Sequence, residues 1–140
     1  MKDLSLSEYQ ALAEFRRQVR GFLHFSEKQV RDRGLEPQQH QLLLAIKGLP
    51  KGVKPTIREL ADRLLLKHHS TVELVDRLAR RGYVSRISGS EDHRQVLVRL
   101  TPAGSSVLRG LSLAHHQELE SAGPALAEAL GRLMKRSSAK

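Results

Sequence analysis

Polar and charged side chains of the kind that bind an anion gather in two short stretches of the sequence. The first stretch, residues 67–81, carries Lys67, His68, His69, Ser70, Val72, Glu73, Arg77, Arg80 and Arg81 at its start or on its expected outward helical face. Cationic side chains can bind phosphate, and a serine hydroxyl can donate to a phosphate or to a base edge. This stretch therefore predicts contact with a nucleic acid.

Glu73 is the exception within this group, because a carboxylate that faces phosphate is repelled. It can accept a hydrogen bond from a cytosine amino group, or it can pair with Arg77 four residues further along a helix. Of these two roles, we expect the ion pair.

The second stretch places Asp92 and Arg94 two residues apart inside the polar segment 88–95. A short acid beside an arginine can hold the guanidinium in one orientation, and a held arginine suits the negative potential of a narrow minor groove. In an ordinary solvated turn the same pair would contribute little to stability. Because the segment lies between two predicted strands, we expect the minor-groove role.

The composition agrees with a polyanionic partner. The 140 residues include 24 Lys and Arg against 15 Asp and Glu, which gives a formal net charge of +9. Each phosphate that such residues neutralise releases condensed counterions. Trp is absent, and only three Phe and two Tyr occur, so the aromatic platforms of single-strand binders are not expected. Duplex DNA is the expected target.

Several classes of protein are disfavoured by what the sequence lacks. It holds no cysteine, which excludes disulfides, thiolate metal sites and a thiol redox switch. No apolar core of a signal peptide follows its first residues, and no apolar run approaches the roughly 20 residues that cross a bilayer. We therefore expect a cytoplasmic protein with no membrane partner.

Hydrophobic spacing predicts the elements at the two ends of the chain. Apolar residues three, four or seven apart predict one long helix over residues 7–33. Thr101 and Pro102 are typical of a helix start, and the helix that they open is expected to end at Gly123-Pro124, before a final short helix over 125–135.

The middle of the chain predicts three shorter helices. The first covers residues 37–47, with proline in its first turn. Thr56, with Glu59 three residues later, forms a capping box that begins the second helix. The third covers about 69–81, with its apolar side chains on one face, and Gly82 ends it.

Two short runs of β-type residues follow, over 83–87 and 96–100, and the polar segment between them predicts an exposed hairpin tip. Two short helices joined by a tight turn and followed by a hairpin make a winged helix-turn-helix. The apolar face of the long first helix is too extended for so small a domain to cover, which predicts a partner chain; packing of this face across its own domain is the alternative.

The expected fold class is thus mainly α (α+β), a winged helix-turn-helix with a small hairpin wing and a helical dimerisation region. The expected organisation is one domain over 1–140, with dimerisation helices in 1–36 and 102–140, the winged helix-turn-helix in 37–101, its recognition helix at about 69–81 and its wing at about 83–101.

At this level of detail the sequence resembles the MarR family of bacterial regulators. The resemblance rests on the motifs LADRL at 60–64, STVELVDRL at 70–78, RGYV at 81–84, DHR at 92–94 and VLVRLTPAG at 96–104. It covers nearly the whole chain in order, and the specific motifs lie between Thr56 and Gly104.

The resemblance implies a homodimer that binds a palindromic DNA operator, with Ser70 and its neighbours in the major groove and Arg94, supported by Asp92, in the minor groove. It also implies a repressor that a small-molecule effector relieves. The segment 67–69 stands where small polar residues or proline are more usual, and Glu73 stands where a basic or polar residue is common. The base contacts and the operator sequence therefore stay open.

Three other interpretations of the function were considered beside a DNA-binding regulator. A winged helix can bind only protein, since fold does not fix function. A metal-responsive regulator could use the histidines with a carboxylate, namely His24, His40, His115 and His116 with Glu27 or Glu118. An enzyme lacks support, because no phosphate-binding glycine loop, nucleophile elbow or zinc-protease motif occurs. Neither a cofactor nor a metal is expected.

Overall fold

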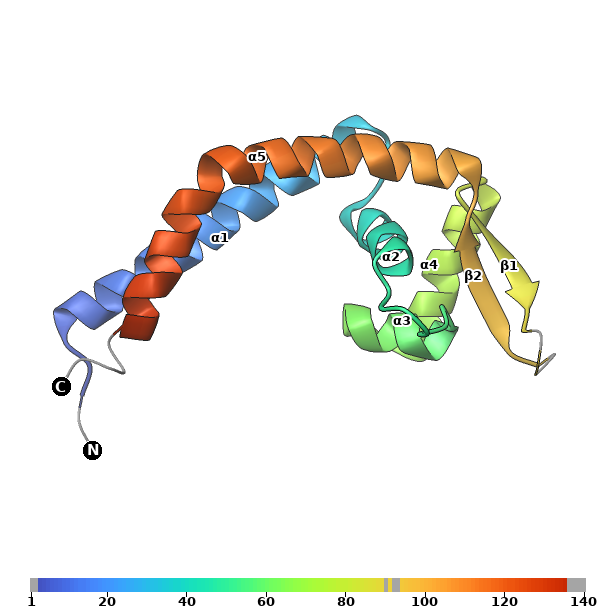
Figure 1. Cartoon of the computed structure of the whole chain (residues 1–140), viewed down its shortest axis with the longest axis horizontal. Helices are drawn as coiled ribbons and strands as arrows, with labels where there is room; N and C mark the ends of the chain where they lie inside the picture. Colours follow the sequence, from blue (N-terminus) through green and yellow to red (C-terminus); the bar gives the residue numbers. More distant parts are fainter. Residues whose placement is uncertain (1–2, 90, 92–93, 136–140) are drawn as a thin grey trace. The chain divides into compact units, whose positions relative to one another are not determined.

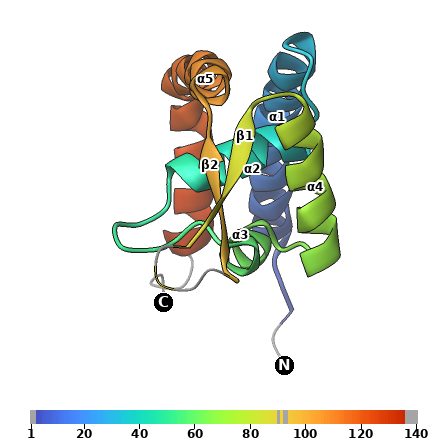
Figure 2. The ribbon, with the colours of Figure 1, turned by 90° about the vertical axis from the view of Figure 1, so that its right-hand side faces the viewer.

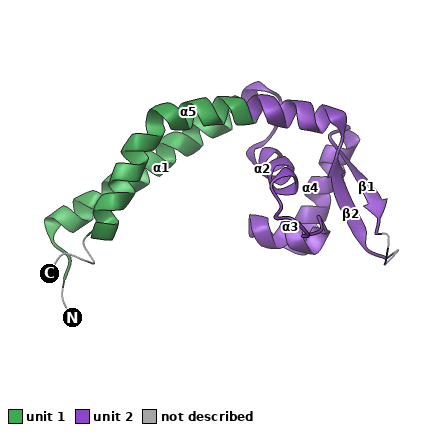
Figure 3. Cartoon of the chain, viewed as in Figure 1, with its two compact units in different colours: residues 1–29, 112–140 green, residues 30–111 purple. Residues whose placement is uncertain are grey.

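A computed structural model describes residues 3–89, 91 and 94–135. The chain divides into two compact units (Figure 3). We call residues 30–111 the winged-helix unit, and residues 1–29 with 112–140 the helical unit. Each unit is described by itself.

The winged-helix unit contains three complete helices and a hairpin (Figures 1 and 2). Their bounds are α2 Pro37–Lys47, α3 Ile57–Leu64, α4 His68–Arg80, β1 Val84–Ser88 and β2 Val96–Leu100. The unit also holds the last residues of α1 (Leu6–Asp32) and the first ten of α5 (Pro102–Lys135). The sequence predicted α2 to the residue, and it placed the start of α4 one residue late.

Local capping explains where α3 begins. The Thr56 side chain accepts a hydrogen bond from the Glu59 backbone N–H at 3.1 Å, which satisfies one of the donors that a helix start leaves free. The turn after α3 is formed by Leu65, whose φ of 56° lies in the left-handed region and whose side chain is 91% exposed. A non-glycine residue in this conformation is strained, and it closes the tight turn between α3 and α4.

One core holds the winged-helix unit together. Its buried side chains come from every element of the unit: Val30, Leu35, Leu42, Leu43, Leu60, Val75, Leu78, Val84, Val98 and Leu111. The buried hydroxyl of Thr71 donates to the Lys67 carbonyl at 3.0 Å, so this polar group enters the core with its hydrogen bond made. The face of α4 that carries Thr71 is consequently fixed toward the core.

The hairpin is antiparallel, and its register pairs Val84 with Leu100 and Ser88 with Val96. A third extended segment joins it, which the sequence reading did not anticipate. Thr56 forms a β-bridge with Leu97, and the Val98 N–H donates to the Pro55 carbonyl at 2.9 Å. The residues that cap α3 are thereby tied to the base of the wing.

The start of α5 is fastened to the start of β1. The Thr101 hydroxyl donates to the Gly82 carbonyl at 2.5 Å, and the Thr101 N–H donates to the Tyr83 carbonyl at 3.1 Å. Gly104 lies directly against the Tyr83 backbone, where a Cβ atom would collide with the Tyr83 carbonyl oxygen. Only glycine allows this approach of helix to strand.

In the helical unit, the corresponding parts of α1 and α5 lie side by side (Figure 1). The expected break at Gly123-Pro124 is wrong, because α5 continues through Pro124 to Lys135. Proline removes one helical hydrogen bond, but the parts of the helix before and after it can still pack against a neighbouring helix. The buried Ala129 on the far side of Pro124 indicates that packing keeps the helix continuous.

The helical unit leaves many large apolar side chains at its surface. They are Leu6, Tyr9, Leu12, Leu23, Leu113, Leu119, Leu130 and Met134, each at least 40% exposed. Its polar groups pair locally. The Gln18 amide, which donates to Glu14 at 2.7 Å, and the neighbouring Arg17 hold the pKa of the Glu14 carboxyl below its ordinary value. None of the helices in the described part of the chain is long and apolar enough to cross a membrane.

Replacement of Gly104 by alanine should destabilise the protein by about 2 kcal/mol or more, because the new Cβ overlaps backbone that cannot move aside cheaply. Gly21 is a matched control. It lies inside α1 with nothing within 4 Å of its Cβ position, so Gly21→Ala should stabilise by about 0.5–1 kcal/mol. Urea unfolding at one fixed protein concentration measures both, and equal effects would contradict the proposed collision.

Candidate nucleic-acid interface

The outward face of α4 carries most of the side chains that the sequence selected. Thr71, Leu74, Val75 and Leu78 are buried, so the helix presents the remaining positions to solvent. Lys67, the N-cap residue, and the exposed His68, His69, Glu73, Arg77 and Arg80 share this surface, with Ser70 and Val72 half-buried beside them. These side chains therefore have the exposure that contact with a groove requires.

The cations of this face differ from some arginines of the unit in one respect. Among the residues that the structure describes, Lys67, Arg77 and Arg80 form no ion pair. By contrast, Arg63 pairs with Glu59 at 2.8 Å on α3. The charge on the outward face of α4 is thus left without an internal counter-charge.

The expected ion pair between Glu73 and Arg77 is wrong, since neither residue pairs with any other in the described part of the chain. The carboxylate of α4 that does pair is Asp76, which accepts from Arg86 of β1. Asp76 lies on the flank of α4 that faces the hairpin, where a partner from another element is in reach. This bond joins α4 to β1, and both side chains are partly exposed.

Arg81 is placed differently from its neighbour Arg80. Its Nη1 donates to the Gly34 carbonyl at 2.5 Å, and its guanidinium lies 5.1 Å from the centroid of the Tyr83 ring. Arg81 ends α4 and holds the turn before α2 against the start of β1. The sequence reading gave Arg81 the same role as Arg80, and the structure gives it these internal contacts.

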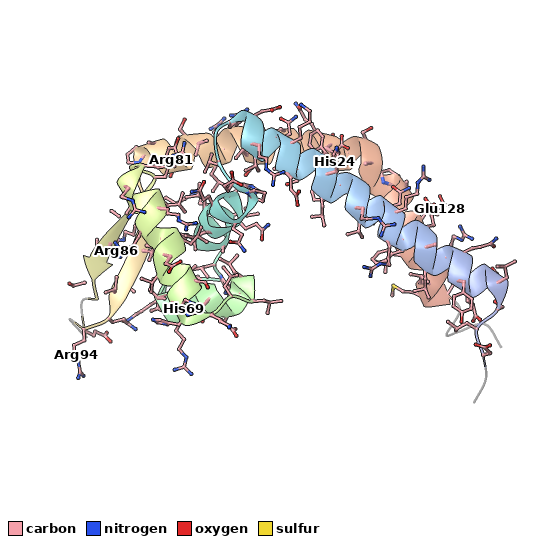
Figure 4. All side chains as sticks on the ribbon, turned by 180° about the vertical axis from the view of Figure 1, so that it is seen from behind. His24, His69, Arg81, Arg86, Arg94 and Glu128 are labelled. Atoms are coloured by element: carbon pink, nitrogen blue, oxygen red, sulfur yellow. The ribbon has the colours of Figure 1, made fainter. Side chains whose placement is uncertain are left out.

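At the tip of the hairpin, Arg94 is exposed and Asp92 lies outside the described residues. In Figure 4, Arg94 extends from the hairpin on the side of the winged-helix unit where His69 marks the start of α4. Nearby, Lys54 and Glu91 form an ion pair at 4.0 Å. Arg94 and the start of α4 therefore lie on the same side of the winged-helix unit.

A hollow of about 350 Å³ lies between the start of α3, the start of α4 and the wing. It is lined by residues 56–58, by His68 and by residues 94–96, and we call it the basic hollow. Arg58 is exposed at its edge and makes no hydrogen bond or ion pair with another described residue. Sequence reading missed Arg58. The sequence could have indicated it, because Arg58 lies two residues after the Thr56 cap, in the first turn of α3 and outside the apolar stripe of that helix.

The histidines considered as metal ligands are scattered. His40 belongs to α2 of the winged-helix unit. In the helical unit, the buried His115 lies with its ring centroid 6.0 Å from those of Phe22 and Phe25, and His116 is 3.6 Å from Glu120. The described residues contain no group of three or more side chains that could hold a metal ion.

Comparison with known proteins agrees with this geometry. Residues 33–95 match the model of the MarR family. The HTH-type transcriptional regulator YfiV of Bacillus subtilis is 33% identical over 64 residues, which make up 46% of this chain and only 40% of that relative.

Solved structures are similar over nearly the whole chain. AbsC, a MarR family transcriptional regulator from Streptomyces coelicolor, has a TM-score of 0.76 and 20% identity, over 97% of this chain and 93% of its own. A variant of MepR from S. aureus bound to an oligodeoxyribonucleotide has a TM-score of 0.66 and 17% identity, over 96% and 94% of the two chains. At these identities the likeness shows the fold.

The chain is therefore a winged helix-turn-helix protein, which confirms the fold class expected from the sequence. The expected resemblance to the MarR family is also confirmed over residues 33–95, which match the family model. The proteins to which the chain is similar are transcriptional regulators and not enzymes, in agreement with the expectation.

Arg81→Ala should lower the free energy of unfolding by about 1–2 kcal/mol, since it removes the bond to Gly34 and the contact with Tyr83. Arg80→Ala removes the same charge from the adjacent position, which makes no hydrogen bond or ion pair with another described side chain, and should change stability by less than about 0.5 kcal/mol. Chemical denaturation compares the two variants. Similar losses in both would show that the internal contacts of Arg81 contribute nothing.

Proposed function

We propose that this protein is a homodimeric transcription regulator of the cytoplasm that binds a palindromic site in double-stranded DNA. The observation that carries the proposal is the outward face of α4, where Lys67, Arg77 and Arg80 form no ion pair with another described residue, beside a hairpin that ends in an exposed arginine. A helix of this width fits the major groove, and a hairpin can reach an adjacent minor groove.

In this proposal the start of α4 enters the major groove. Lys67, His68 and His69 contact phosphates or base edges, and Ser70 donates to either. Glu73, which has no internal partner among the described residues, accepts from a cytosine amino group. Val72 offers an apolar contact to a thymine methyl group, while Arg77 and Arg80 contact the backbone.

Arg94 enters the minor groove, with Asp92 as its support. The narrow groove concentrates negative potential, which favours a guanidinium held in place. The exposure of Arg94 at the tip of the hairpin supports this role.

The helical unit supports the dimer. Leu12, Leu23, Leu113 and Leu130 are among its exposed apolar side chains, and a second copy of the chain is the surface that buries them. The dimerisation region is residues 1–36 and 102–140, and residues 37–101 read DNA. Two copies related by a two-fold axis match two half-sites of a palindrome.

Occupation of the operator excludes the transcription machinery, so the protein acts as a repressor. A small-molecule effector relieves repression when it changes the separation of the two recognition helices. This separation must match the half-site spacing, because each recognition helix has to meet its own major groove.

Selection from a library of genomic fragments at physiological salt tests DNA recognition directly. The wild type should enrich a palindromic site, and Arg94→Ala should bind that site roughly tenfold more weakly. Arg99→Ala, an exposed arginine on the same hairpin away from its tip, is the matched control and should bind within about twofold. Failure to enrich any fragment over random DNA would refute sequence-specific regulation.

Light scattering tests the dimer. The wild type should have twice the 15.7 kDa mass of one chain at micromolar concentration. Leu130→Glu should shift the mass toward one chain, because it places a charge in the proposed apolar interface. Leu65→Glu makes the same change at an exposed site of the winged-helix unit and should leave the mass unchanged. A monomeric wild type would contradict the proposed dimer.

A further inference from the structure

The basic hollow brings together cations that are distant in sequence. Arg58 comes from the first turn of α3, His68 from the first residue of α4, and Arg94 from the wing. None of the described residues that line the hollow is acidic. The surface between the three elements is therefore suited to an anion.

Two acidic residues close to these cations in sequence are already engaged. Glu59, next to Arg58, pairs with Arg63 at 2.8 Å. Glu91, close to Arg94, pairs with Lys54 at 4.0 Å. Arg58 forms no ion pair with another described residue, although Asp62 follows four residues later on α3.

Two helices also begin at the hollow. Ile57 is the first residue of α3 and His68 the first of α4, and both line it. The first backbone N–H groups of a helix lack helical acceptors, and the helix dipole adds partial positive charge at this end. The Thr56 side chain satisfies one N–H of α3, whereas the N-cap residue Lys67 makes no side-chain cap on α4. Backbone donors thus reinforce the side-chain cations.

The Thr56–Leu97 bridge keeps the hollow in shape. It ties the cap of α3 to strand β2, directly beside the wing residues that form the other wall. The backbone that precedes Arg58 is therefore held beside strand β2 by hydrogen bonds.

We propose that the basic hollow receives one phosphate group of the DNA backbone, and that Arg58 is the side chain that anchors it. This inference rests on the proposed function and adds to it a site between the two reading elements. The phosphate lies between the groove entered by α4 and the groove entered by the wing, so the contact sets the register of both. It reads no base, because every nucleotide carries the same phosphate.

The test is the salt dependence of binding, measured by fluorescence anisotropy on the selected site and on two unrelated duplexes. Loss of one phosphate contact lowers the slope of log Kobs against log salt concentration by about 0.9, so Arg58→Ala should lower the slope by about 2 for a dimer with two hollows. The loss of affinity should be similar on all three duplexes. Arg58→Lys keeps the charge and should restore most of the slope.

Arg109→Ala is the matched control, since it removes an exposed arginine from α5, which contributes nothing to the hollow. Its slope should equal that of the wild type. Circular dichroism checks that each variant is folded, and exposed Arg58 makes no internal contact whose loss would unfold the unit.

Two results would overturn the inference while the proposed function stands. An unchanged slope in Arg58→Ala would show that no backbone phosphate occupies the hollow. If calorimetry then found inorganic phosphate bound by the wild type and not by this variant, the occupant would be free phosphate. A loss confined to the selected site would instead make Arg58 a base-reading residue. A wild type that binds none of the duplexes would refute the proposed function itself.

Discussion

The burial of one face of α4 is the constraint on which the rest of the winged-helix unit depends. Thr71, Leu74, Val75 and Leu78 recur at the spacing of a helical stripe, and all four lie in the core. Complete burial of a leucine or valine contributes about 1.5–3 kcal/mol. A rotation of the helix by one residue would drive the Glu73 carboxylate toward the core, which costs several kcal/mol. The outward face is therefore fixed by what the inward face buries.

The arginines of the winged-helix unit divide into two groups around this constraint. Arg81 and Arg86 bond to other parts of the unit and hold the end of α4 and the hairpin in place, while Arg63 pairs with Glu59 inside α3. Arg77 and Arg80 make no such bonds in the described part of the chain. Some arginines of the unit therefore stabilise the fold, whereas others extend into solvent. The sequence gives both groups the same charge and does not distinguish them.

Much of the fold follows from local sequence patterns, and the exceptions have physical causes. The bounds of α2 and the Thr56 cap of α3 were predicted correctly, because proline and threonine act on their nearest neighbours. The other half of the predicted capping box is wrong, because the Thr56 N–H donates to the Lys54 carbonyl and not to Glu59. The predicted break at Pro124 was wrong. Proline costs the helix one hydrogen bond, but the packing of the residues before and after it keeps the helix continuous. The Thr56–Leu97 bridge was missed because it joins residues 41 positions apart.

The candidate site was predictable where it lies on one helix and unpredictable where it needs several elements. The helical period of α4 selects its outward residues without a structure. The Asp76–Arg86 bond and the basic hollow depend on how the hairpin folds back beside the helices. The spacing of residues along the chain does not show that the hairpin lies beside these helices.

The short bridge between Thr56 and Leu97 also bears on the solubility of the protein. Strand β2, with the sequence VLVRL, is apolar and rich in β-branched residues, and an unpaired edge of such a strand can recruit other chains into a growing sheet. One edge of β2 is occupied by β1, and the other is partly occupied by residues 55 and 56. Pro55 has no N–H to offer, so the added segment does not itself become a template. The loop that precedes α3 therefore also protects the wing against aggregation.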